Sequence, residues 1–421
     1  MKHPLKIALV CPYNMFERTG GVQQLVTHLH NGLVKKGHIV RIITQRPAGF
    51  TGEIPQDYIL FGTSRNFKGG FGTSGNLGMP ADGAQIARIL NEEQFDVINF
   101  HEPWLPMLAW QMIKHSKSAH VATFHANLAD TTAGKSWTSS VFKPYARPLL
   151  EKMDLFTAAS PAASAMLISR ANMKLKRDRQ LIGGIKYIPN GIDLKIYKPP
   201  KKRQPLNGPN TKTIVYIGRL ERRKGVDWLL RAFALLEAKM PNVYLIIAGE
   251  GPWRDKLEQL ADSHDIKNIH FSGYVEDEEK RRLMGNADVF CSPAIFGESF
   301  GIVLTEAMAM GAPVVAGRNS GYINVLTGSG RLGLVDPRAT EDFADRLELI
   351  ATDEKVNRLL RGWGLREVKK YDYPKIVDQY EAAYIGALQQ ATDEKNGKSV
   401  AKNEPVKKPF IHRLLIRRHA R

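Results

Sequence analysis

The sequence predicts an α/β fold with two doubly wound Rossmann-like domains that face a central cleft. Short aliphatic runs alternate with helical patterns through most of the 421 residues, which is typical of parallel sheets covered by helices. The alternation stops in a proline- and lysine-rich stretch between Asn190 and Thr213, and then it starts again. Two such units predict a ligand site between them, because ligands bind at the carboxyl ends of parallel strands.

In the first half, five aliphatic runs read as buried parallel strands. They are residues 6–10, 39–44, 96–100, 120–124 and 155–159, with helices expected at 22–36, 81–93 and 139–152. In the first helix, leucines recur every four residues and form an apolar stripe. Residues 49–83 are rich in glycine and break the pattern, so we expect a mobile substrate loop there, with plain irregular surface as the alternative.

The second half repeats the alternation. Strands are expected at 213–217, 243–248, 270–271, 289–291, 313–316 and 333–335, and helices at 226–239, 253–263, 341–361 and 374–388. The predicted organisation is an N-terminal domain (1–195), a linker (196–212) and a C-terminal domain (213–372). A helix at 373–390 is expected to cross back to the N-terminal domain, and a basic tail follows at 391–421.

The composition excludes several classes of protein. Hydrophobic residues make up 43% and charged residues 24%, which rules out a disordered, collagen-like or disulfide-stapled chain. The only two cysteines, Cys11 and Cys291, fit reduced thiols. No aliphatic run approaches the roughly 20 residues of a membrane-spanning helix, and the N-terminal run is too short for a secretory signal. We therefore expect a cytosolic protein.

The net charge of +18 predicts an anionic partner, which could be nucleic acid, an anionic membrane or a phosphorylated substrate. Residues 391–421 hold nine Lys or Arg and only three Asp or Glu. Within this tail, Phe410, Ile411, Leu414 and Leu415 would share one helical face, which predicts an interfacial membrane anchor. A disordered basic tail without a partner is the alternative.

The pair Gly20–Gly21 is expected to open a helix at the end of the first strand. Paired glycines let the backbone approach a ligand, and a helix N-terminus favours negative charge. A tight turn with no ligand is an equal alternative. The segment is not G-x-G-x-x-G, which disfavours a Rossmann dehydrogenase.

Two cations follow the first strand of the second half. Arg219 lies at the carboxyl end of this strand, and Lys224 precedes the next helix. Their positions suit a diphosphate leaving group, with a solvated basic loop as the alternative.

Other polar residues with possible chemical roles lie at a helix start, within that helix or at strand ends. Glu298 precedes a helix and Glu306 is expected about two turns into it, so both could face one ligand; for Glu298 a favourable helix-start charge is the alternative. Glu306 lies among apolar residues, where an unpaired carboxylate is costly.

His125 ends a strand, as do His101 and Glu102. A functional role in the cleft is one interpretation of these residues, and a purely structural role is the alternative. No Cys/His cluster has zinc spacing.

Taken together, these segments resemble the family 4 retaining glycosyltransferases, which have the GT-B fold. The resemblance is carried by Gly218–Arg219 with Lys224–Gly225, by residues 188–193, and by Glu298–Gly301 through Glu306. Within this family, the N-terminal half is most similar to the phosphatidylinositol mannosyltransferases, through residues 10–13, 20–23, 95–97, 101–103 and 122–125.

The resemblance implies transfer of mannose from GDP-mannose to the inositol of a membrane phospholipid. On the donor side, it implies that Arg219 and Lys224 hold the diphosphate, Glu306 the ribose and Glu298 the mannose hydroxyls. It also places Gly20, Gly21, Gly249, Val275, Phe300, Gly301 and Ile302 beside the donor. On the acceptor side, it places His125 beside the reacting centre and Tyr13 beside the inositol. Lys135 would hold the acceptor phosphate, in a loop longer than that of the family.

We therefore expect a membrane-peripheral mannosyltransferase that binds an anionic phospholipid and no nucleic acid. The resemblance implies no tightly bound metal and leaves room for Mg²⁺ to accompany the nucleotide sugar. A family 4 enzyme with another donor, such as UDP-glucose, and another lipid or glycan acceptor is the alternative. The rival from a different class is a basic nucleic-acid-binding protein, although no RRM, KH or zinc-finger pattern is present.

Overall fold

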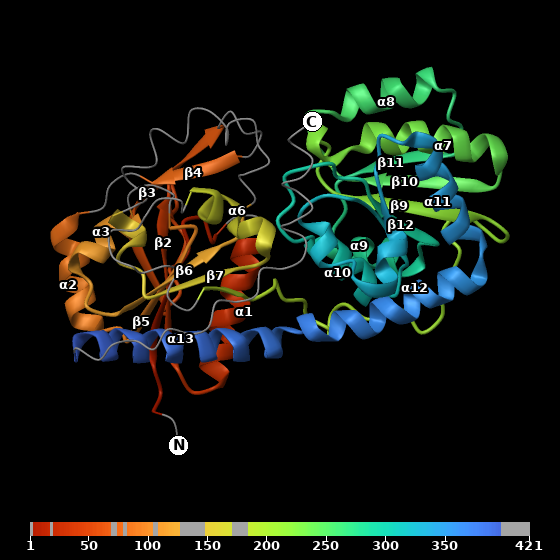
Figure 1. Cartoon of the computed structure of the whole chain (residues 1–421). Helices are drawn as coiled ribbons and strands as arrows, with labels where there is room; N and C mark the ends of the chain where they lie inside the picture. The colour runs from red at the N-terminus through yellow and green to blue at the C-terminus, as the bar shows by residue number, and fades with distance from the viewer. Residues whose placement is uncertain are drawn as a thin grey trace, which may run out of the picture.

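Two α/β units lie side by side, and the last long helix, α13, runs along the N-terminal one (Figure 1). This computed structural model describes residues 3–16, 20–68, 74–78, 82–103, 108–126, 148–170 and 184–396.

The first unit is built on an eight-stranded sheet with the order β4-β3-β2-β1-β5-β6-β7-β8. All neighbouring strands are parallel except β3 and β4. The strands are β1 (Lys6–Val10), β2 (Ile39–Pro47), β3 (Tyr58–Lys68), β4 (Ser74–Gly78), β5 (Val97–His101), β6 (Ala119–Phe124), β7 (Leu155–Ala158) and β8 (Ile185–Tyr187). The helices are α1 (Gly21–Lys35), α2 (Gly83–Glu93), α3 (Leu108–His115) and α6 (Pro161–Arg170).

The second unit has a six-stranded parallel sheet with the order β11-β10-β9-β12-β13-β14. Its strands are β9 (Lys212–Ile217), β10 (Val243–Ala248), β11 (Ile269–Gly273), β12 (Val289–Ser292), β13 (Val314–Gly317) and β14 (Leu334–Val335). The helices are α7 (Val226–Lys239), α8 (Arg254–Ser263), α9 (Asp277–Asn286), α10 (Ile302–Ala309), α11 (Thr340–Thr352) and α12 (Glu354–Glu367). In each sheet the strand order reverses beside the first strand, β1 or β9, which is where such folds bind ligands.

The two doubly wound sheets confirm the predicted fold class. Strands β1, β5 and β6 are rich in aliphatic residues and buried along almost their whole length. Strands of this kind need helices on both faces of the sheet, because neither face can be left to water.

The expected loop at residues 49–83 was wrong, because this stretch contains β3 and β4. β3 pairs in parallel with β2, with Tyr58 opposite Ile42, and Phe61 is fully buried. The run Tyr58–Ile59–Leu60–Phe61 was therefore a strand signal, and the surrounding glycines obscured it.

The single helix expected at residues 341–361 was also wrong, because the structure has α11 and α12 there. Asp353 between them has an extended backbone, and its carboxylate accepts hydrogen bonds from the amides of Lys355 and Val356. An aspartate in this position caps a new helix. Most of the helix expected at residues 139–152 lies outside the described residues.

Helix α13 (Tyr373–Lys395) follows the second unit in the chain but packs against α1 and β6 of the first. Ile376, Val377 and Tyr380 are buried in one apolar cluster with Leu25 and Leu29 of α1. These contacts place the end of the described chain beneath the central strands of the first sheet.

The chain crosses between the units twice, and the two crossing segments pair with each other. The backbone N–H of Ile192 donates to the carbonyl of Tyr371 at 2.8 Å, and that of Tyr373 donates back to Ile192 at 3.1 Å. A Cβ at Gly191 would lie 2.3 Å from the ring of Tyr373, so only glycine fits at this crossing.

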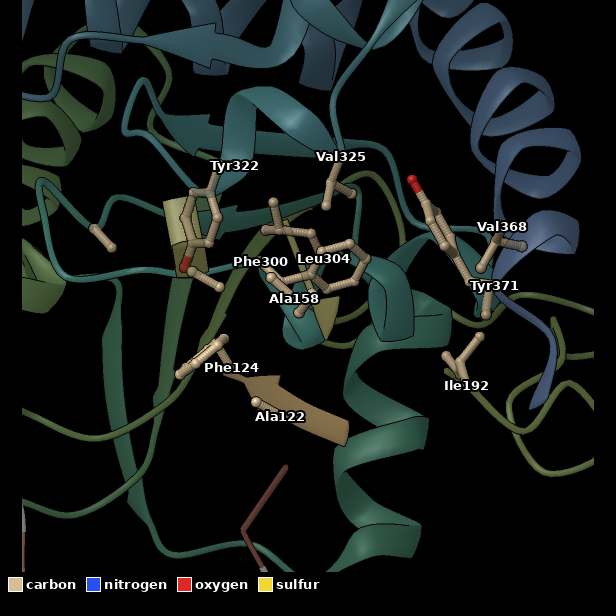
Figure 2. Close-up of a cluster of buried hydrophobic side chains, with 14 of the residues drawn as sticks. Ala122, Phe124, Ala158, Ile192, Phe300, Leu304, Tyr322, Val325, Val368 and Tyr371 are labelled. Carbon is tan, nitrogen blue, oxygen red and sulfur yellow. The ribbon is translucent and has the colours of Figure 1, made fainter. Parts of the chain in front are cut away.

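One hydrophobic cluster contains side chains from both units. Figure 2 shows Ala122 and Phe124 of β6 and Ala158 of β7 in the same view as Phe300 and other side chains of the second unit. The ring of Phe300 packs edge-on against Tyr371, with centroids 5.4 Å apart. The units therefore meet along the edges where β6 and β7 end.

Replacing Ile376 by alanine should lower the free energy of unfolding by about 2–5 kcal/mol, because a fully buried side chain would leave a cavity. Unfolding in urea measures this change. The matched control is Gln389→Ala on the exposed face of the same helix, which should change the stability by less than about 0.5 kcal/mol. Equal stabilities for Ile376→Ala and the wild type would contradict the docking of α13.

Candidate active site

Two helix N-termini meet where the units touch. α1 begins at Gly21 and α10 begins at Ile302, and a Cβ on Gly21 would lie 2.6 Å from Cδ1 of Ile302. Gly301 precedes α10 with a φ of +113°, in the region that favours glycine. The first amides of a helix lack partners within it and carry partial positive charge, so this junction favours an anion.

A cluster of charged side chains follows β9 on the same side of the second unit. Glu298 accepts hydrogen bonds on Oε1 from Lys224 Nζ at 2.7 Å and from Arg223 Nη1 at 2.8 Å. Glu221 contacts Arg223 Nε at 3.0 Å and Arg219 Nη2 at 2.8 Å. Three cations thus face two carboxylates, and this ion cluster keeps a net positive charge.

Glycines let the backbone segments around the ion cluster approach closely. Gly225 ends the 3-10 turn Arg222–Lys224 with a φ of +68°, and a Cβ there would lie 2.3 Å from the carbonyl oxygen of Pro293. A Cβ on Gly249 would lie 1.9 Å from the carbonyl oxygen of Gly218. Side chains at these two positions would push apart the strand ends that position Arg219 and Lys224.

Val275 and Tyr274 follow β11 on the carboxyl edge of the same sheet. Val275 is partly buried against the cluster shared by both units, while Tyr274 is exposed. Together with Gly249 after β10, they supply an apolar and aromatic surface at this edge.

Glu306 lies inside α10 and is 5% exposed. Its Oε1 accepts hydrogen bonds from Tyr197 OH at 2.9 Å and from Lys280 Nζ at 2.6 Å. The sequence indicated that a buried carboxylate at this position needs a partner, and Lys280 and Tyr197 supply it. Because α10 begins at Ile302, Glu306 lies one turn into the helix and not two, and it bonds different residues from Glu298.

Two buried histidines and a glutamate occupy the facing edge of the first unit. His125 follows β6 and is 6% exposed, and its Nε2 lies 2.8 Å from Nδ1 of His101 at the end of β5. Glu102 accepts hydrogen bonds from the backbone amides of His125 and Ala126, each at 2.6 Å. Burial lowers the pKa of His125 to about 4 and holds the pKa of His101 well below its usual value.

Tyr13 follows β1, next to these residues. Burial raises the pKa of its phenol, and the charge of Glu102 raises it further. The structure therefore gathers Tyr13, His101, Glu102 and His125 at the carboxyl ends of three neighbouring strands. Lys135 lies outside the described residues.

Some residues of the site carried no recognised signal in the sequence. Arg223 and Glu221 belong to a charged run in which only Arg219 and Lys224 stood out. Lys280 lies in a helix with many charges, and nothing local indicates that it pairs with Glu306, 26 residues away. Ser160 of the first unit donates a hydrogen bond to the carbonyl of Ser299 in the second, and this contact is visible only in the folded chain.

No group of three or more His, Cys, Asp or Glu in the described ranges could hold a metal ion. Within the same ranges, no helix has both the length and the apolar character needed to cross a bilayer.

Two family profiles match the chain. One, described as Glycosyltransferase Family 4, covers residues 19–196, and the other, Glycosyl transferases group 1, covers residues 198–361. The chain is 32% identical over 386 residues to the phosphatidyl-myo-inositol mannosyltransferase of Mycolicibacterium smegmatis, covering 90% of this chain and 93% of that protein. It is 31% identical to the phosphatidyl-myo-inositol mannosyltransferase of Propionibacterium freudenreichii, covering 91% and 96%.

Solved structures of glycosyltransferases share the fold. Sucrose-phosphate synthase from Thermosynechococcus elongatus aligns with a TM-score of 0.68 and 22% identity, over 90% of this chain and 98% of that one. Because the profiles span both units and the identity to curated relatives exceeds 30% over most of the chain, the protein is a GT-B enzyme that belongs to the family 4 glycosyltransferases.

Proposed function

We propose that this enzyme transfers mannose from GDP-mannose to the inositol of phosphatidylinositol, with retention at the anomeric carbon, at the inner face of the cell membrane. The observation that carries the proposal is the extent of the identity to phosphatidyl-myo-inositol mannosyltransferases, which covers 90% of the chain. Such a match includes the first unit, which supplies the acceptor side in this proposal, as well as the second.

The ion cluster and the two helix N-termini support the donor assignment. A diphosphate placed between α1 and α10 would meet unpaired amides, Arg219 and Lys224. These groups would stabilise the negative charge that grows on the leaving group. The glycines at 21, 249 and 301 let the backbone segments that would surround the donor pack closely together, because a Cβ at each would clash with a neighbour, and Gly20 precedes Gly21 at the start of α1.

The two glutamates have separate roles in this proposal. In the ligand-free protein, Glu298 forms ion pairs with Arg223 and Lys224. When Lys224 binds the diphosphate in its place, Glu298 binds the mannose hydroxyls. Glu306 binds the ribose hydroxyls, with its carboxylate oriented by Tyr197 and Lys280. The amides of Phe300, Gly301 and Ile302 lie beside the sugar phosphate, and Gly249 and Val275 border the nucleotide.

The acceptor side is formed by Tyr13 and His125 of the first unit, with Lys135 as the proposed contact for the lipid phosphate. The inositol oxygen bonds to the anomeric carbon on the face that the nucleotide leaves. The bond between that carbon and the phosphate oxygen breaks, and the departing phosphate oxygen takes the hydroxyl proton. This route needs no covalent nucleophile and no tightly bound metal, and Mg²⁺ can accompany the nucleotide.

Product analysis with several donors tests the proposal. The full chain should convert GDP-mannose and phosphatidylinositol vesicles to a mannosylated phosphatidylinositol, detected by mass spectrometry. UDP-glucose as donor and diacylglycerol as acceptor serve as matched controls and should yield none. Transfer from UDP-glucose alone, or to another lipid or glycan alone, would establish the alternative family 4 activity.

Arg219→Ala and Lys224→Ala should each lower turnover about 10²–10³-fold, because each removes an electrostatic contact to the leaving group. Steady-state kinetics with the donor measures the loss. Arg222→Ala is the matched control, since Arg222 is an exposed cation in the same turn. Turnover close to that of the wild type in both site variants would remove the diphosphate assignment.

The membrane contact is proposed for the basic tail, of which residues 397–421 lie outside the described ranges. Truncation after Asn396 preserves α13 and should weaken sedimentation with anionic vesicles, because each basic residue near such a surface contributes about 1 kcal/mol. Binding of the soluble donor should not change. A full-length variant with Arg413, Arg417, Arg418 and Arg421 replaced by Gln keeps the apolar residues of the tail and removes four positive charges. Its sedimentation with vesicles therefore shows how much of the membrane binding depends on charge. Equal sedimentation of the intact and truncated chains would exclude the tail.

A further inference from the structure

A line of buried side chains runs from α13 through the first sheet to the proposed active site. Asn99 Nδ2 donates to Tyr384 OH of α13 at 2.7 Å and lies 3.3 Å from His101 Nε2. His101 Nδ1 lies 2.8 Å from Nε2 of His125. We call Tyr384, Asn99, His101 and His125 the histidine relay, and all four are buried.

The orientation of the Asn99 amide sets the direction of this relay. Its Oδ1 accepts a hydrogen bond from Thr123 Oγ1 of β6 at 2.7 Å. The two hydrogens on Nδ2 are then directed at Tyr384 and His101. In this amide orientation Nδ2 donates to both partners, so Nε2 of His101 is the acceptor and carries no proton.

The proton positions in the rest of the relay follow from this. A neutral imidazole that accepts on one nitrogen carries its proton on the other, so His101 donates from Nδ1 to Nε2 of His125. His125, which accepts on Nε2, then carries its proton on Nδ1. Burial lowers the pKa of both histidines, so each is neutral near pH 7.

Nδ1 of His125 is buried and has no hydrogen-bond partner among the residues that the structure describes. A buried N–H group without a partner costs free energy, so such groups are rare unless a ligand completes them. The nitrogen belongs to a residue at the carboxyl edge of the sheet, where ligands of this fold bind.

We propose that the histidine relay fixes His125 in the tautomer protonated at Nδ1, which makes it a hydrogen-bond donor to an oxygen of the bound sugar or acceptor and not a general base. Tyr384, Asn99 and His101 are positioning residues for this donor. The inference rests on the proposed function for the presence of a substrate oxygen at His125. The tautomer itself is a property of the free enzyme.

Nitrogen-15 NMR of the imidazoles in the full chain tests the tautomer directly, with signals assigned by His125→Gln and His101→Gln. At pH 7 both residues should show a protonated Nδ1 and an unprotonated Nε2. His120 is the internal reference, since its Nδ1 lies 3.0 Å from the carbonyl of Lys152 and must donate to it. A protonated Nε2 on His125 would overturn the proposal.

Asn99→Asp tests whether Asn99 sets the direction. A carboxylate of nearly the same shape can only accept hydrogen bonds, so Nε2 of His101 should become protonated while the His120 signals stay unchanged. An unprotonated Nε2 on His101 in this variant would show that Asn99 does not control the relay. The wild-type spectrum decides the tautomer even if the variant fails to fold.

Kinetics separates this inference from the proposed function. Asn99→Asp should lower turnover about 100-fold, as does the loss of a donor at a reacting oxygen, with little change in the KM for the donor. Absence of transfer by the wild type with every donor would reject the proposed function and leave the NMR result standing. Wild-type turnover in an Asn99→Asp variant whose NMR spectrum shows Nδ1 of His125 without a proton would overturn the donor role of His125.

Discussion

The proposed active site depends on the pairing of the two segments by which the chain crosses between its units. Ile192 and residues 371–373 exchange backbone hydrogen bonds, and α13 then continues into the core of the first unit. The ring of Tyr373 stacks on His28 of α1 with centroids 3.6 Å apart, so this crossing is tied directly to the helix whose N-terminus lies at the site. A change at this crossing would move α1 relative to α10, because both units are anchored to it.

The two sides of the site differ in electrostatic character. On the second unit, cations and carboxylates neutralise each other in part, and the excess positive charge suits a nucleotide diphosphate. On the first unit, the buried imidazoles are held neutral by desolvation. In the proposed reaction, charge on the leaving group would meet the cations of the second unit, and the acceptor hydroxyl would meet the neutral imidazoles of the first.

Helix α13 contributes both to the apolar core of the first unit and to its buried hydrogen bonds. Its apolar side chains complete the core against α1, and Tyr384 ends the line of hydrogen bonds that leads to His125. The same docking contact thus buries apolar surface and brings Tyr384 to the hydrogen bonds that lead to His125. Because buried polar networks are costly unless each member is paired, the interior of the relay leaves little freedom for its histidines.

The sequence by itself determined the fold class, since aliphatic runs at regular spacing can be buried only in parallel sheets with covered faces. It also placed Arg219, Lys224, Glu298 and His125 at strand ends or helix starts, because local patterns define those boundaries. It missed β3, where glycines obscured a strand signal, and the break at Asp353. Only the tertiary structure decided that Lys280 and Tyr197 bond Glu306 and that Tyr384 and Asn99 reach His101. Such pairs join residues far apart in the chain, and periodicity within one segment holds no information about a partner on another element.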